Sequence, residues 1–283
     1  MWIWMALGSA VLLGLYDVSK KIALSKNTVL NVLLVATGLS ALFLSPLLFV
    51  YKGGTEDHLR LLLKAVLVSS SWISGMMALR KLPLTVVSTL KASRPFFVVL
   101  FSILLFGEQL NLWQWGGVVF ALTAVVLLSR TGESEGIDFL RNRGIWAMAV
   151  SILTGVASAL YDKHILQDME PLFVQSWTNV YITAILALCV AFGSRVAPDD
   201  ARPFRWDWMM VVIALLITAA DALYFFAVKQ DGALLSVISL ARRSSVVVTF
   251  AIGAIFFKEK NIRSKAVALS VLMVGMVLLL IGS

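Results

Sequence analysis

The chain has 283 residues, of which 60% are hydrophobic and 14% are charged, and its mean hydropathy is +0.91. Because a soluble domain is roughly a quarter charged, this composition excludes a soluble globular protein and leaves no room for a soluble domain. The formal net charge of +8 comes from Lys and Arg residues scattered without a basic block, which argues against nucleic-acid binding and fits membrane topology and solute binding.

Apolar runs bounded by charged residues, Gly or Pro predict ten transmembrane helices, since a helix needs about 20 apolar residues to cross a bilayer. In chain order, the expected spans are residues 2–23, 29–51, 61–80, 83–106, 112–130, 144–166, 171–193, 207–228, 233–257 and 263–282. The first run has neither a basic segment before it nor a small-residue cleavage site. We therefore expect a retained helix and not a signal peptide.

Cysteine and histidine are scarce. Cys189 is the single cysteine, which excludes a disulfide framework, and the histidines are His58 and His164. These residues give no Cys/His spacing of a metal site, so we expect no metal. No ATP-binding motif is present and no cofactor is implied, so transport would draw its energy from a gradient.

Two short patterns of the first half recur in the second half. Tyr16-Asp17 of the first span recurs as Tyr161-Asp162 of the sixth, and Ser88–Lys91 of the fourth recurs as Ser239–Arg242 of the ninth. Such self-similarity at a fixed distance is typical of duplicated architectures.

The repeats divide the chain into two five-helix units, residues 1–130 and 144–283. Because five is an odd number, the second unit must enter the membrane in the opposite sense. The prediction is thus an all-α polytopic membrane protein whose ten helices form an inverted repeat, as in transporters that work by alternating access. In this register Lys91 falls on Arg242.

This organisation resembles the EamA-type transporters of the drug/metabolite transporter superfamily. Gly107-Glu108 and Lys258-Glu259 follow the fourth and ninth spans, and Pro95 lies within the fourth. Two further pairs close the third and eighth spans: Ala78-Leu79 and Ala227-Val228. The resemblance covers essentially the whole chain, and it implies a central cavity between the halves and the export or exchange of metabolites.

The chain departs from the family pattern at one proline. A proline is expected in both repeats, but Val246 occupies the position that corresponds to Pro95. A kink is therefore expected in the fourth helix, whereas the ninth lacks the residue that would cause one.

Four basic residues lie inside predicted spans: Lys91 and Arg94 in the fourth, and Arg242 and Arg243 in the ninth. An ionised side chain at the bilayer centre costs about 2.5 to 3.5 kcal/mol on insertion scales, so four uncompensated cations would cost on the order of 10 kcal/mol. They need anions or a wet cavity. The repeat register favours Lys91 and Arg242 as the cavity residues.

The internal acids are Asp17, Asp162 and Asp221. Asp17 is followed by Lys20 and Lys21 at helical spacings of three and four, which predicts that it is neutralised locally. Asp162 has basic neighbours as well. The surplus of cations in the fourth and ninth spans then remains for a bound solute, and Arg suits a carboxylate or a phosphate held by two hydrogen bonds.

Basic residues in these two helices are similar to those of the triose-phosphate and other sugar-phosphate translocators of the same superfamily. That resemblance implies an anionic, phosphorylated substrate contacted by Lys91, Arg242 and Arg243, with Arg94 nearby. The spacing of these residues does not by itself indicate that the substrate carries a phosphate.

Each of these residues also has an alternative interpretation. Lys91 and Arg242 could extend to a membrane interface, and Arg94 and Arg243 could pair with an acid or a backbone carbonyl. Two aromatic residues within spans, Trp72 and Tyr224, are candidates to line the cavity, or else they only pack. Two acids, Glu108 and Glu259, are expected at the start of the helix that follows each of them, where an anion complements the helix dipole.

The candidate residues for proton coupling or gating are Asp17, Lys20, Asp162 and His164. The alternative is that the two aspartates form structural salt bridges and that His164 is interfacial.

Membrane orientation is where two arguments disagree. The family resemblance implies cytoplasmic termini, whereas the distribution of Lys and Arg over the loops favours the opposite sense. We retain the family orientation, in a bacterial inner membrane, for a monomer or a homodimer.

The sequence thus predicts a secondary transporter, not an enzyme, that exports or exchanges a small organic anion together with protons or a counter-anion. Two alternatives stay open: an exporter of neutral or zwitterionic metabolites such as amino acids, and an integral membrane enzyme acting on lipids. A channel is a further alternative.

Overall fold

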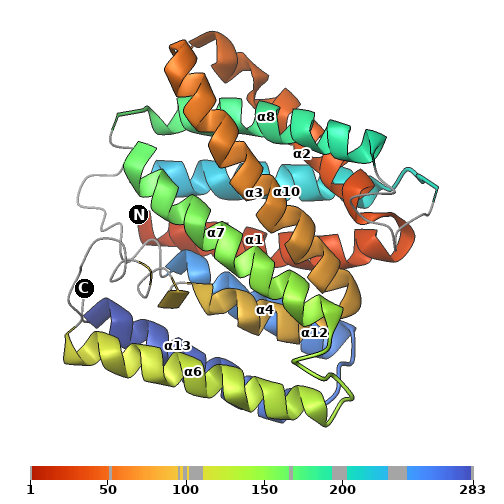
Figure 1. Ribbon diagram of the computed structural model, residues 1–283, viewed down its shortest axis with the longest axis vertical. Helices are drawn as coiled ribbons and strands as arrows, with labels where there is room; N and C mark the ends of the chain where they lie inside the picture. The colour runs from red at the N-terminus through yellow and green to blue at the C-terminus, as the bar shows by residue number, and fades with distance from the viewer. Residues whose placement is uncertain are drawn as a thin grey trace.

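The computed structural model describes residues 2–50, 53–94, 96–97, 101, 111–165, 168–192, 203–228 and 241–281. All regular secondary structure in these ranges is helical, which confirms the predicted all-α class (Figure 1). The described helices are α1 (Trp2–Lys26), α2 (Val29–Val50), α3 (Thr55–Lys81), α4 (Leu84–Ala92), α6 (Leu112–Glu133), α7 (Arg143–Ile165), α8 (Pro171–Ala191), α10 (Trp208–Val228), α12 (Ser245–Phe256) and α13 (Ile262–Ile281).

Seven of the described helices are long and apolar enough to cross a membrane: α1, α2, α3, α6, α7, α8 and α13. They coincide with predicted spans to within a few residues at most ends. The fourth and ninth predicted spans are described only in part, as α4 with a few following residues and as residues 241–256. Glu108, Pro95 and the side chain of Lys163 lie outside the described residues.

The helices pack in pairs that combine an early helix with a late one. α3 packs along α7 and α1 along α10, while α2 pairs with α8, α4 with α12 and α6 with α13. In Figure 1, α6 and α13 lie at one end of the molecule, α2 and α8 lie at the other, and the remaining pairs lie between them. This pairing is what exchange of two similar halves would produce; the division at 1–130 and 144–283 stays a prediction.

Small residues allow the closest of these pairs to approach. A Cβ atom on Gly117 of α6 would lie 2.8 Å from the carbonyl oxygen of Gly275 on α13. Lipid tails provide no hydrophobic driving force for helix association. Close backbone packing at these glycines therefore contributes to holding the two helices together.

Two serines interrupt the helices that carry the internal cations. The backbone N–H of Ser93 and its Oγ both donate to the carbonyl of Leu90, at 3.1 and 2.6 Å. Ser244 makes the same two bonds to Ala241, at 3.1 and 2.6 Å. The register that aligns Lys91 with Arg242 also aligns these serines. The ninth span therefore turns without a proline, because a serine side chain competes for the carbonyl that a regular helix would use.

Glu259 does not serve the helix that follows it, contrary to expectation. Its carboxylate accepts hydrogen bonds from the backbone N–H groups of Leu84, at 2.6 Å, and Thr85, at 3.1 Å. These are the first N–H groups of α4, whose N-cap residue, Pro83, makes no side-chain cap. The anion complements a helix N-terminus as predicted, but the helix belongs to the other half of the chain.

Candidate functional site

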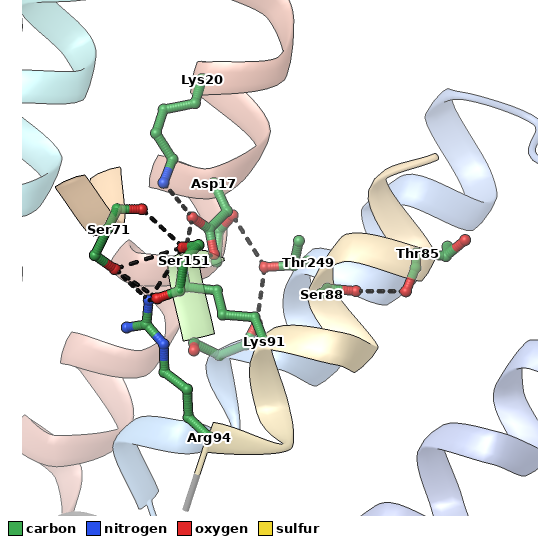
Figure 2. Close-up of polar contacts among 11 residues, drawn as sticks. Asp17, Lys20, Ser71, Thr85, Ser88, Lys91, Arg94, Ser151 and Thr249 are labelled. Carbon is green, nitrogen blue, oxygen red and sulfur yellow. Dashed lines mark hydrogen bonds and ion pairs between the residues drawn. The ribbon is translucent and has the colours of Figure 1, made fainter. Parts of the chain in front are cut away.

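Charged side chains from α1 and α4 meet at the centre of the bundle. Asp17 lies 2.6 Å from the Nζ atom of Lys20, and both of its oxygens accept hydrogen bonds of 2.9 Å from the Nζ atom of Lys91 (Figure 2). The local pair with Lys20 is as predicted. The pair with Lys21 is not: the Lys21 Nζ atom donates instead to the carbonyls of Leu79 and Leu82, at the end of α3.

Arg94 takes a different kind of partner. Its Nη2 atom donates to the Ser71 hydroxyl at 2.7 Å and to the Ser151 carbonyl at 2.9 Å (Figure 2). Gly155 leaves room for the guanidinium, since a Cβ atom there would lie 2.4 Å from the Arg94 Cζ atom. Pairing with a backbone carbonyl was the alternative interpretation of Arg94, and this contact agrees with it.

The ninth span contributes a second ion pair. Arg242 bonds the carboxylate of Asp221 on α10, and its guanidinium lies 4.5 Å from the centroid of the Tyr224 ring. Its Nε atom is buried without a hydrogen-bond partner among the described residues. The sequence analysis assigned no partner to Asp221. The sequence did contain a clue to this partner. The positions three and four residues away on either side of Asp221 carry no basic residue, so a cation that pairs with it must come from another helix.

Arg243 is the exception among the internal cations. Its side chain is exposed, and in the part of the chain that the structure describes it has neither a hydrogen bond nor an ion pair. Arg94 and Arg242 both lie within electrostatic range of it. We call Asp17, Lys20, Lys91, Arg94, Asp221, Arg242 and Arg243 the central network.

A cavity adjoins the central network and is lined by α1, α2, α3, α8 and α10. Much of the space between these helices is filled by side chains, and the cavity is partly open at its mouth. Tyr16, Lys20 and Asp221 line it where it meets the network, and the rest of the wall is uncharged. Polar residues on that wall include Thr37, Ser40, Gln175, Asn179 and Thr218.

This helical bundle, with partly buried pairs of charges beside a cavity, can be compared with known proteins. The sequence pattern of the EamA-like transporter family matches residues 1–130 and 142–281. The chain belongs to the EamA-like transporter family. It is therefore an integral membrane protein and a transporter, which confirms the predicted class and the prediction that it is not an enzyme.

Two individual proteins are similar to this EamA-like chain. The riboflavin transporter of Rhizobium johnstonii is 25% identical over 179 residues, which cover 62% of this chain and 54% of the relative. The chain thus matches about half the length of that relative. A solved crystal structure superposes with a TM-score of 0.64 at 15% identity, covering 97% of this chain and 95% of the other, and this likeness concerns the fold.

The structure separates the predicted site residues of this EamA-like transporter. Trp72 and Lys20 line the cavity, whereas Lys91, Arg94, Arg242, Arg243 and Tyr224 lie outside its lining. Their roles in binding stay predictions.

The other coupling candidates lie elsewhere. Asp162 pairs with Lys64 of α3 at 2.5 Å, and His164 is exposed with its ring 6.4 Å from that of Tyr161. Neither residue lines the cavity. Among the described residues, no group of three His, Cys, Asp or Glu side chains is placed to hold a metal ion.

The uncharged polar residues of the wall were missed by the sequence analysis. Gln175, Asn179 and Thr218 lie in apolar helices, where a neutral polar residue costs little enough to occur at a helix interface as well as in a cavity. Only the packing of both α8 and α10 against α2 brings them together.

Proposed function

We propose that this chain is a secondary transporter that exports or exchanges a small organic anion by alternating access, with residues 1–130 and 144–283 as its inverted halves. The observation that carries the proposal is the charge of the central network. Among the described residues it has five cations, Lys20, Lys91, Arg94, Arg242 and Arg243, against the two carboxylates of Asp17 and Asp221. An excess of three positive charges inside a membrane protein favours an anionic ligand.

Two arginines account for most of the excess. Arg94 is bound by neutral oxygens, and Arg243 has no described partner. A carboxylate or phosphate that reached Arg243 would gain a charge-assisted hydrogen bond, the stronger kind, and would relieve the repulsion from its two arginine neighbours.

A neutral solute is the second candidate. The cavity wall beyond Lys20 and Asp221 is uncharged, and Lys91 and Arg242 already have carboxylate partners. An aromatic body could stack on Trp72 and bond the side-chain amides of Gln175 and Asn179. The name of the Rhizobium relative points to such a compound, because riboflavin is neutral and planar.

Matched pairs of solutes separate these two functions. Protein in liposomes is loaded with one compound, and uptake of its labelled form is measured by counterflow. The pairs are riboflavin 5′-phosphate with riboflavin, and indole-3-acetate with indole-3-acetamide. The proposal predicts saturable exchange of the anion of at least one pair above its neutral partner. Exchange of the neutral partners without their anions, or of no compound, contradicts it.

Arg243→Gln tests the carrying observation directly. We expect the exchange of the anion to fall by roughly ten- to a hundredfold, equivalent to about 1.4 to 2.8 kcal/mol, since a charged hydrogen bond to the ligand is lost. Because Arg243 supports no described neighbour, the variant should unfold at an unchanged temperature. Arg130→Gln, an exposed arginine in the last turn of α6, is the matched control and should leave exchange intact. Unchanged exchange in Arg243→Gln would remove the basis of the proposal.

A further inference from the structure

We propose that Asp221 is the proton-binding site of this transporter, and that binding of the transported anion to Arg242 is coupled to binding of a proton to Asp221. The inference rests on the proposed function. It assigns the coupling ion to a residue that the sequence analysis left without a role.

Geometry places one member of this pair, Asp221, on the cavity wall, and its partner Arg242 next to it but outside the lining. Asp221 lines the cavity, and its side chain is 26% exposed. Arg242, with 23% of its side chain exposed, contacts it through a single oxygen, Oδ1. The Nε–H group of Arg242 has no acceptor among the described residues. A carboxylate or phosphate that displaces Asp221 thus replaces one bond to Arg242, and the buried Nε–H becomes a second donor when the side chain moves.

Among the described residues, Arg242 is the cation that pairs with Asp221, and Arg243, although it has no ion-pair partner, forms no bond to this carboxylate. α1 brings Tyr16, Asp17 and Lys20 to the same region, and Lys20 is already held by Asp17 at 2.6 Å. α2, which also packs against α10, contains no ionisable residue. The remaining neighbours with a charge or a titratable group are Arg243, beside Arg242 in the chain, and Tyr224 on α10 itself.

A bound anion therefore changes the charge state of Asp221. When the anion bonds Arg242, the carboxylate of Asp221 loses its cation at a depth where an unpaired charge is costly. A carboxyl oxygen of Asp221 then forms an O–H bond with a proton that the bulk solution supplies through the cavity. In the empty state the pair is neutral, and in the loaded state a monoanion on Arg242 accompanies a neutral carboxylic acid. The charge of the pair is the same in both states, so one proton accompanies each monoanion.

The other two internal acids lack this arrangement. Asp17 is held by two lysines from two helices, so displacement of one leaves the other. Asp162 pairs with Lys64 away from the cavity. Asp221 alone among these three both lines the cavity and depends on one cation.

Binding to the purified full-length protein in detergent tests the inference. Riboflavin 5′-phosphate, indole-3-acetate and riboflavin are titrated at pH 7 in weak buffer, and proton uptake is followed with a pH indicator. We expect about one proton taken up per bound riboflavin 5′-phosphate and none with riboflavin. A phosphate can itself take up a proton on binding, because its second pKa is about 6, so the comparison with Asp221→Asn decides where the proton binds.

Asp221→Asn gives a result that a structural role would not. The proton uptake should disappear, while the affinity for riboflavin 5′-phosphate should rise by roughly tenfold because no carboxylate competes for Arg242. Asp207→Asn is the matched control. It lies at the start of the same helix, its carboxylate lies 3.5 Å from Lys26, and an asparagine can still accept the bond from the Met209 N–H. This variant should behave as the unaltered protein.

The possible results distinguish failure of the inference from failure of the proposed function. Binding of riboflavin 5′-phosphate without proton uptake, or with equal uptake in Asp221→Asn, overturns the role of Asp221 and leaves anion transport standing. If the affinity of Asp221→Asn for riboflavin 5′-phosphate falls, the proposed competition between Asp221 and the anion for Arg242 is overturned. If neither riboflavin 5′-phosphate nor indole-3-acetate binds, the proposed function fails and the inference fails with it.

Discussion

Single residues of the central network show how the protein keeps cations inside a membrane. Lys91 and Arg242 have carboxylates from other helices, whereas Arg94 is bound by a hydroxyl and a carbonyl. The sequence predicted that these cations need partners, because an unpaired charge is expensive there. It could not say which, since the partner of Lys91 is 74 residues away and that of Arg94 on α7 is 57 residues away.

Gly155 tests the binding of Arg94. Gly155→Ala should displace the guanidinium from Ser71 and Ser151 and lower the free energy of unfolding by about 1 to 3 kcal/mol, the cost of buried polar groups that lose their partners. Thermal unfolding in detergent measures the change. Gly116→Ala is the control, because the nearest heavy atom to its new Cβ would be a Leu278 methyl carbon at 3.6 Å. Equal stability of the two variants would show that Arg94 is not held in this way.

At the scale of elements, the two halves join where helix ends share polar partners. Glu259, between α12 and α13, caps α4, and it lies 4.0 Å from the Nζ atom of Lys265. Lys265 is fully buried and also pairs with Glu135, at 2.9 Å. Four segments of the chain thus meet through one buried group of charges. Hydropathy located each helix, but not this junction, because hydropathy says nothing about which helix ends meet.

Glu259→Gln should weaken that junction. The variant keeps an acceptor for α4 but loses the charge that complements both the helix N-terminus and buried Lys265, so we expect the free energy of unfolding to fall by about 1 to 3 kcal/mol. Thermal unfolding is again the measurement. Glu56→Gln, which removes an exposed acid of a surface pair with Arg60, should leave the midpoint unchanged. A midpoint for Glu259→Gln equal to that of this control would contradict the junction.

At the scale of the whole molecule, the predicted number of spans determines on which faces of the membrane the two termini lie. The predicted ten crossings would put the two termini on the same face of the membrane, and Figure 1 places the start of α1 and the end of α13 on the same side of the bundle. The family resemblance and the distribution of basic residues disagree only on which face that is.

Labelling of the termini resolves both points. A cysteine tag placed before Trp2 or after Ile281, in a chain whose Cys189 is changed to Ser, should react with an impermeant reagent from the same side of the membrane in either construction. Labelling from opposite sides would mean an odd number of spans and would overturn the two five-helix halves. Labelling from the cytoplasmic side alone would support the family orientation over the count of basic residues.

The sequence by itself determined the helical class, the membrane location and the residues that carry charge inside the bundle. Apolar runs, repeats and the cost of buried charge are local properties of the chain. Only the tertiary structure decided that Asp221 pairs with Arg242, that Glu259 caps a helix of the other half, and that Gln175 and Asn179 line a cavity with Trp72. The physical reason is that a helix satisfies its own backbone, so its sequence indicates where it lies in the bilayer but not which side chains face it across the bundle.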